Sequence, residues 1–241
     1  MTYEWFTLEG EPLSSSEGNV VTARELLDLL EPEVVRYFFA LNPRKARDLD
    51  VERLDRLVDD FDHLERVALG RKDDPDLAPF AERVYPFLVD EIHEERVRIP
   101  YAVAAVLGMT DDSKLRQRLA RDDGHLPADT SDEAVAAALN RVERARTWAA
   151  RTGNRYDYRL QTNLPAVEFD ATTAAALDDL ADVVESGADG EEIQATIYET
   201  ARDNGMEVGD FFAAGYRLFF DDTEGPRLGE FLGDLDRSFV V

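Results

Sequence analysis

The sequence predicts an all-α fold that follows a short extended N-terminal segment. Apolar residues recur three and four positions apart over long stretches, most regularly in residues 51–69 and 131–151, as they do on one face of a helix. A capping box at Thr22 and Glu25, and glycines such as Gly70 and Gly187, mark where helices start and stop. The length of 241 residues is enough for a substantial core and one or two domains.

The expected elements follow one another along the chain. Residues 3–8 look extended and aromatic, as an edge strand or a hairpin without its sheet, and a turn at residues 9–12 leads into a loop. Leu26, Leu27 and Leu30 would form the packed side of the first helix. The expected helices are 22–30, 32–40, 51–69, 77–95 with a break near Pro86, 100–108, 112–121, 131–151, 171–186, 190–204, 208–220 and 226–236.

Two side chains of the long helix at residues 131–151 have an expected environment. Trp148 would lie at the edge of the core, and a base-stacking role is the less favoured alternative. Arg141 would be balanced by Glu143 and other nearby charges. Farther along, the aromatic stripe of residues 208–220 has helical spacing, which is typical of a core rather than of a cofactor site.

The charge composition is strongly acidic. The net charge is −25, and the chain has only three lysines, Lys45, Lys72 and Lys114. Many acids and few lysines in a folded chain resemble proteins of salt-accumulating halophilic archaea. Such a surface repels RNA at low salt, but at molar salt the Debye length is about 3 Å, so local contacts decide binding. An alternative is that the acidity reflects solubility alone.

Several chemistries are disfavoured by composition. The absence of cysteine removes disulfides, thiolate catalysis and cysteine-based zinc sites. His63, His93 and His125 are isolated from one another in the sequence, so no metal site is expected. No stretch is long and apolar enough for a membrane span and no signal-peptide pattern is present, so a cytoplasmic protein without membrane or DNA partners is expected.

A loop rich in serine, glycine and asparagine, residues 12–22, precedes the first helix. Its hydroxyls and the backbone N–H groups near a helix start could hold a phosphate. It has neither a P-loop lysine nor a G-x-G-x-x-G spacing, and such loops are mostly simple turns. The candidate nucleotide-binding residues in this loop are Ser14, Ser15, Ser16, Gly18 and Asn19.

This loop resembles the Lys-Met-Ser-Ser-Ser-Lys-Gly-Asn form of the class I aminoacyl-tRNA synthetase signature, as found in class I lysyl-tRNA synthetases. The similarity extends over most of the chain and is strongest in residues 4–66 and 191–241. It includes Pro32-Glu33-Val34-Val35-Arg36-Tyr37-Phe38-Phe39, Asn42-Pro43-Arg44-Lys45-Ala46-Arg47-Asp48-Leu49-Asp50 and Gly225-Pro226-Arg227-Leu228-Gly229-Glu230-Phe231-Leu232.

The sequence also departs from the family pattern. The two lysines of the family loop fall on Pro12 and Glu17, so two cations expected to neutralise ATP phosphates are missing. The second family signature, His-Ile-Gly-His, is absent, and in the family it lies in a Rossmann domain ahead of this loop. The resemblance therefore implies a C-terminal part without catalytic residues that binds no cofactor alone, whereas the intact enzyme uses ATP with Mg.

The resemblance also implies tRNA contacts. The cluster Arg44, Lys45 and Arg47 resembles a family region that contacts the tRNA, and its alternative is a surface network with neighbouring acids. Tyr156 could stack on an unpaired base or pin its loop to the core. Arg227 begins the last helix, within the region that reads the anticodon in the family. A second basic group, residues 114–121, could touch RNA or pair with nearby acids.

These expectations combine into one organisation with two functional alternatives. Residues 1–70 would form the signature loop and a helical stem-contact region, and residues 71–241 a helical cage resembling the anticodon-binding domain of class I synthetases. The chain would be the C-terminal part of a lysine–tRNA ligase that binds tRNA(Lys), with adenylation performed by a separate catalytic half or not at all. The alternative is a non-catalytic helical module, derived from the synthetase, that binds RNA or protein.

Overall fold

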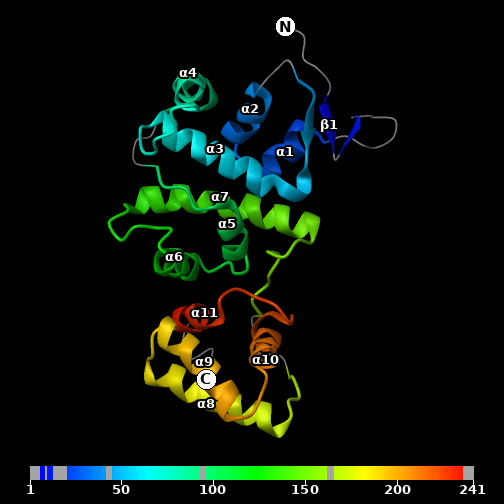
Figure 1. Cartoon of the computed structure of the whole chain (residues 1–241), viewed down its shortest axis with the longest axis vertical. Helices are drawn as coiled ribbons and strands as arrows, with labels where there is room; N and C mark the ends of the chain where they lie inside the picture. The colour runs from blue at the N-terminus through cyan, green and yellow to red at the C-terminus, as the bar shows by residue number, and fades with distance from the viewer. Residues whose placement is uncertain are drawn as a thin grey trace. The chain divides into compact units, whose positions relative to one another are not determined.

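The computed structural model confirms a mostly helical fold with a short extended N-terminal segment (Figure 1). It describes residues 6–8, 10–12, 21–41, 45–92, 96–161 and 166–235. The strands and first helices are β1 Phe6–Leu8, β2 Glu11–Pro12, α1 Ala23–Leu29, α2 Pro32–Ala40, β3 Arg47–Leu49, a 3₁₀ turn Val51–Arg53, α3 Leu54–Ala68, α4 Ala78–Leu88 and α5 Tyr101–Leu107. The remaining helices are α6 Ser113–Asp122, α7 Asp132–Thr152, α8 Ala171–Ser186, α9 Gly190–Asp203, α10 Val208–Phe220 and α11 Leu228–Asp234.

The N-terminal strands form a small sheet in the order β2-β1-β3. β1 pairs with β2 in antiparallel fashion and with β3 in parallel, so Thr7 lies opposite Asp48. The Asp48 carboxylate accepts hydrogen bonds at 2.7 Å from the Thr7 hydroxyl and from the backbone N–H of Gly10, which fixes the turn after β1. The parallel partner β3 was not predicted, because its residues read as a charged cluster and not as a strand.

The first two helices start as predicted. The Thr22 side chain accepts from the N–H of Glu25 while the Glu25 carboxylate accepts from the N–H of Thr22, which completes the capping box of α1. Pro32 occupies the first turn of α2. One core prediction is wrong: Leu26 and Leu30 are buried, but Leu27 is 40% exposed and Leu29 takes its place in the core.

The chain divides into two compact units, residues 1–108 with 129–157 and residues 109–128 with 158–241. These units differ from the ranges 1–70 and 71–241, because α4, α5 and α7 pack with the elements that precede residue 70. The assignment of the ranges 1–70 and 71–241 to a stem-contact region and an anticodon cage remains a prediction.

The first unit is built around α3, α5 and α7. Trp148 on α7 is fully buried, not at the core edge, and its indole N–H donates to the Val51 carbonyl at 2.7 Å. Its ring lies 5.3 Å from that of Tyr101 on α5. The expected helix 77–95 is shorter than predicted: α4 continues through Pro86 and ends two residues later at Leu88, and the described residues 89–92 are not helical. The missing N–H of Pro86 therefore affects only the last turn of α4.

The second unit packs α11 against α9 and α6, with α8 and α10 completing it. Phe211, Phe219 and Phe220 of α10 are buried, which confirms the aromatic core stripe. Phe219 and Phe220 both contact the ring of Phe231 on α11, at centroid distances of 5.7 and 5.0 Å. Among the helices that the structure describes in either unit, none is both long and apolar enough to cross a lipid bilayer.

Candidate nucleic-acid interface

The predicted nucleotide-binding loop lies outside the described residues. Ser14, Ser15, Ser16, Gly18 and Asn19 belong to this gap, as does Glu17. The described chain stops at Pro12, the last residue of β2, and resumes at Val21, next to the N-cap of α1. The role of the five loop residues therefore remains a prediction.

The predicted basic cluster is partly described, because Arg44 also lies outside the described residues. Lys45 is exposed to solvent. Arg47, on β3, is half-buried: its Nη1 donates to the Phe38 carbonyl at 3.1 Å and its guanidinium lies 5.7 Å from the centre of the Phe38 ring. Burial lowers the pKa of Arg47. Arg47 thus ties β3 to the end of α2, whereas Lys45 offers its charge to solvent.

Tyr156 is half-buried just after α7. Its ring centre lies 6.0 Å from that of Trp148, and the Arg155 guanidinium lies 4.9 Å from the tyrosine ring. Arg155 also donates from Nη2 to the Tyr156 hydroxyl at 2.7 Å. These contacts agree with a loop pinned to the core by its aromatic side chain. Base stacking on Tyr156 would use the part of the ring that remains exposed.

Arg227, in the second unit, is the N-cap residue of α11. Its side chain is 59% exposed and forms an ion pair with Glu230, one turn along the helix. Pairing with the half-buried Glu230 carboxylate uses only part of the guanidinium, so several of its N–H donors can face water. Arg227 is therefore accessible for an RNA contact.

The arginines of α6 bind mostly backbone carbonyls of their own unit. Arg116 donates to the Thr110 carbonyl at 2.8 Å and lies 3.7 Å from the Asp111 carboxylate. Arg118 donates to the Asp234 carbonyl from Nε at 3.1 Å and from Nη2 at 2.7 Å, at the end of α11. Arg121 donates to the Pro127 carbonyl at 2.7 Å. These contacts agree with the alternative in which the basic residues 114–121 bind within the protein and not to RNA. Most of their partners, however, are backbone carbonyls and not the nearby acids that were expected.

A buried arginine cluster in the first unit was not predicted from the sequence. It joins three arginines to four carboxylates from α2, its N-cap and α3: Arg96, Arg98 and Arg141 with Glu31, Glu33, Asp62 and Glu65. Arg141 on α7 is 3% exposed. Its Nε donates to Glu31 at 2.6 Å, and its two Nη atoms donate to Asp62 at 2.6 and 2.8 Å.

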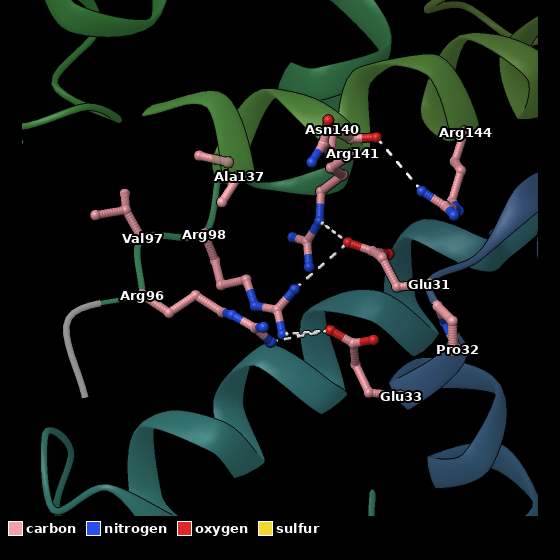
Figure 2. A pocket seen from close by; sticks show the side chains of 11 residues that line it. Glu31, Pro32, Glu33, Arg96, Val97, Arg98, Ala137, Asn140, Arg141 and Arg144 are labelled. Carbon is pink, nitrogen blue, oxygen red and sulfur yellow. Dashed lines mark hydrogen bonds and ion pairs between the residues drawn. The ribbon is translucent and has the colours of Figure 1, made fainter. Parts of the chain in front are cut away.

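Arg98 is the second centre of the buried arginine cluster. Figure 2 shows its guanidinium between Glu31 and Glu33. Nε of Arg98 donates to Glu65 at 2.9 Å, Nη2 donates to Glu33 at 3.0 Å, and the Glu65 carboxylate also accepts from the Tyr85 hydroxyl at 2.8 Å. A hollow of ≈ 210 Å³ opens beside these groups, between Glu31, Arg98 and Asn140 (Figure 2).

Four groups of the buried arginine cluster, Glu31, Glu65, Arg98 and Arg141, have pKa values shifted so as to favour their charged forms. Burial alone would raise the pKa of Glu31, but the charges of Arg141 and Arg98 lower it. Burial would likewise raise the pKa of Glu65, and the hydrogen bonds and charge of Arg98 lower it. The pKa values of Arg98 and Arg141 are raised above the usual value, because the carboxylates outweigh burial. Groups locked in one charge state near pH 7 are poor general acids or bases. The cluster therefore serves as a cross-link between α2, α3 and α7.

A signal for this cluster exists in the sequence. Arg141 falls on the same helical stripe as the buried Ala138, Val142 and Ala145, and Asp62 lies next to Phe61 on the apolar stripe of α3. Charged residues on an apolar stripe must find a partner of opposite charge. The stripe does not identify the partner, because Arg141 and Asp62 are 79 residues apart in the sequence.

Paired carboxyl groups join α6 to α11 in the second unit. Asp234 shares a hydrogen bond with Asp122, and Glu230 shares one with Asp123. Burial, followed by the hydrogen bond and charge of Asp122, raises the pKa of Asp234 to about 7, while Arg118 acts in the opposite sense. One carboxylate oxygen of Asp234 is buried without a hydrogen-bond partner. Below pH about 7 the native state therefore favours a protonated Asp234.

This pairing predicts a pH-dependent stability. Between pH about 4 and pH about 7, Asp234 keeps a proton in the native state that it has lost in the unfolded state. The free energy of unfolding should therefore decrease as pH rises through this window. Asp234→Asn should flatten this dependence and stabilise the protein at pH 8 by about 1–2 kcal/mol, after allowance for solvent screening. Thermal unfolding at pH 5, 7 and 8 checks this, with the exposed Asp203→Asn as a control that should keep the wild-type profile. Parallel profiles for wild type and Asp234→Asn would contradict it.

Comparison with known proteins identifies the relatives of this chain. Residues 1–86 match the family model for tRNA synthetases class I (K). The whole chain is 57% identical to a lysine–tRNA ligase of Haloarcula marismortui and 56% identical to those of Halobacterium salinarum and Natronomonas pharaonis. In each case the alignment covers 100% of this chain but 45% of the relative.

These similarities agree with the features found in the sequence. The relatives from three halophilic archaea fit the acidic, lysine-poor composition. The chain spans a little under half the length of the lysine–tRNA ligases that it matches. The resemblance predicted from the sequence is confirmed: the chain is similar to tRNA synthetases class I (K) over residues 1–86 and to lysine–tRNA ligases along its full length.

Proposed function

We propose that the chain is the C-terminal, tRNA-binding part of a lysine–tRNA ligase and that it binds tRNA(Lys) in the cytoplasm. The observation that carries this proposal is the identity of 56–57% to lysine–tRNA ligases along the full 241 residues. In the intact enzyme, ATP with Mg would activate lysine for attachment to the tRNA. The chain alone contributes binding, and a catalytic part joined to it or separate from it performs the adenylation.

The exposed cations support RNA binding. Lys45 in the first unit and Arg227 in the second present charge to solvent, whereas Arg47, Arg116, Arg118 and Arg141 are bound within their own units. RNA backbone contacts need accessible cations that point at phosphates. Under this proposal Lys45 and Arg227 are RNA contacts, Arg47 positions the strand that follows Lys45, and the half-buried Tyr156 is a candidate for base stacking.

A second candidate function rests on the signature loop. Pro12 and Glu17 replace the two lysines of the family pattern, which would weaken phosphate binding during adenylation. A helical module that binds RNA or protein and has no role in aminoacylation would carry such a loop without penalty. This candidate predicts that a catalytic half supplied separately restores no lysylation.

The test is a comparison of three RNAs in molar KCl: transcribed tRNA(Lys), tRNA(Lys) with a changed anticodon, and an unrelated tRNA. We expect the chain to bind the first at least about tenfold more tightly than the others, because one lost base readout costs on the order of 1.4 kcal/mol or more. Equal affinity for all three RNAs would contradict the proposal.

Variants of the exposed cations complete this test. Lys45→Gln and Arg227→Gln should each weaken binding of tRNA(Lys) several-fold, since each removes about one phosphate contact. Arg202→Gln, an exposed arginine on α9, is the matched control and should leave the affinity unchanged. Addition of ATP, lysine and a separately expressed catalytic half of a related ligase then tells the two candidate functions apart by the lysylation of the tRNA.

A further inference from the structure

A second hollow in the first unit gathers arginines at a surface. It has a volume of ≈ 520 Å³ and lies along the end of α3, next to the buried arginine cluster. Its lining includes Arg66, Arg71, Arg96 and Arg98, with Asp59, Asp62 and Glu65. We call it the α3 hollow.

The end of α3 explains why Arg66 and Arg71 meet. Gly70 adopts a left-handed conformation with φ of 68°, which reverses the chain after the helix. The backbone N–H of Arg71 then donates to the carbonyl of Arg66 at 2.8 Å, and that of Lys72 donates to the same oxygen at 3.2 Å. The Arg71 side chain is fixed in turn, since its Nη1 donates to the Arg96 carbonyl at 2.9 Å.

Two of the three acids that line the α3 hollow are already bound by arginines of the buried arginine cluster. Asp62 is bound by both Nη atoms of Arg141, and Glu65 accepts from Arg98 at 2.9 and 3.1 Å. Asp59 remains, and its pKa is raised because burial and the neighbouring Asp62 and Asp55 disfavour its charge. Arg98 and Arg96 are ion-paired with Glu65 and Glu33, so the charge that the hollow can offer to a ligand comes mainly from Arg66 and Arg71.

Arg66, Arg71 and Arg96 have donors to spare. Arg66 and Arg71 are exposed, and Arg96 is half-buried with Nη1 on Glu33 at 3.0 Å. A guanidinium has five N–H donors, so one hydrogen bond from Arg71 or Arg96 leaves most of its donors for a ligand. Planar guanidinium groups bind phosphate oxygens with two parallel hydrogen bonds, which makes arginine the preferred residue for phosphate recognition.

We propose that the α3 hollow binds a phosphate of an RNA backbone, held by Arg66, Arg71 and Arg96. The proposal rests on the proposed function, which supplies the RNA. Arg98 and Arg141 are positioning residues here, because they neutralise the acids behind the hollow and hold the segment that carries Arg96. The contact is independent of sequence, so it strengthens binding of any tRNA that reaches this surface.

The test measures affinity for tRNA(Lys) and for an unrelated tRNA over a series of KCl concentrations. Each phosphate contact contributes roughly 0.7–0.9 to the slope of log K against log salt. The double variant Arg66→Gln/Arg71→Gln should reduce this slope by about 1 for both RNAs and lower the affinity several-fold at the lowest salt used. Arg66→Gln alone should give a smaller change in the same direction.

The matched control is Arg56→Gln, which removes an exposed arginine of the same helix that does not line the hollow. It should leave slope and affinity unchanged, and far-UV circular dichroism shows that all variants are folded. An unchanged slope in the double variant, with wild-type binding intact, would overturn this site and leave the proposed function standing. A reduced slope without selectivity for tRNA(Lys) supports the site and contradicts the proposed function, whereas failure of wild type to bind either RNA contradicts both.

Discussion

Arg141→Met is expected to lower the free energy of unfolding by about 3–5 kcal/mol, the usual loss when one partner of a buried ion pair is removed. Methionine fills a similar volume, so packing around α7 is largely kept. Glu31 and Asp62, which are 7% exposed, would then remain buried without the guanidinium that neutralises them. Thermal and denaturant unfolding in molar KCl measure the loss.

The pH dependence of this loss distinguishes an unpaired charge from a packing defect. In the wild type the pKa of Glu31 is lowered, so its contribution to stability is present at neutral pH and is lost as pH falls toward acid. In Arg141→Met the buried carboxylates should have raised pKa values and should bind protons as pH falls from 7 to 4. The difference in stability between wild type and variant should therefore shrink over this range.

Arg151→Met is the matched control, because Arg151 is exposed on the same helix. It should change stability by no more than about 0.5 kcal/mol. A loss for Arg141→Met of similar size, or one that stays constant from pH 7 to pH 4, would show that the cluster does not act as a buried charge network.

The helices were predictable where a signal is local. The Thr22–Glu25 capping box, Pro32 at the start of α2 and the left-handed Gly187 after α8 each depend on residues within one turn of the helix end. The ranges 171–186 and 208–220 expected from the sequence coincide with α8 and α10. Local chemistry therefore accounts for most of the secondary structure of the chain.

The wrong predictions depend on contacts between distant residues. Periodicity alone placed Leu27 in the core, but the orientation of α1 is decided by what α1 packs against, so Leu29 is buried instead. β3 becomes a strand because β1, 41 residues earlier, offers it a parallel edge. Arg141 looked like a surface charge because its partners Glu31 and Asp62 lie 110 and 79 residues away.

The candidate site was predictable only through resemblance. Composition alone favoured a surface network for Arg44, Lys45 and Arg47, and the resemblance made an RNA contact an equal alternative. The structure separates exposed Lys45 from half-buried Arg47. The α3 hollow has no sequence signature, because Arg66, Arg71 and Arg96 come together only through the reversal at Gly70 and the hydrogen bond of Arg71 to the Arg96 carbonyl.

Gly229→Ala is the second large expected effect, and it concerns the second unit. α11 approaches α9 so closely at Gly229 that an added Cβ would lie 2.5 Å from the backbone N and 2.6 Å from the Cα of Gln194. The N–H of Gly229 also donates to the Gln194 side-chain oxygen at 2.8 Å, which fixes the register of the two helices. Backbone atoms cannot move aside as a side-chain end can, so α11 must shift. Overpacking of this kind costs about 1–3 kcal/mol or more.

Gly209→Ala is the matched control, because Gly209 lies in α10 of the same unit and an added Cβ would have no neighbour within 4 Å. Alanine is a better helix former than glycine by about 1 kcal/mol, so this variant should be neutral or more stable than wild type. The two glycine-to-alanine changes should therefore shift the thermal midpoint in opposite directions. An equal thermal midpoint for Gly229→Ala and Gly209→Ala would show that α9 and α11 do not meet at Gly229. The segment Gly225–Leu232, which resembles the synthetases, would then not be fixed by contact with Gln194 on α9.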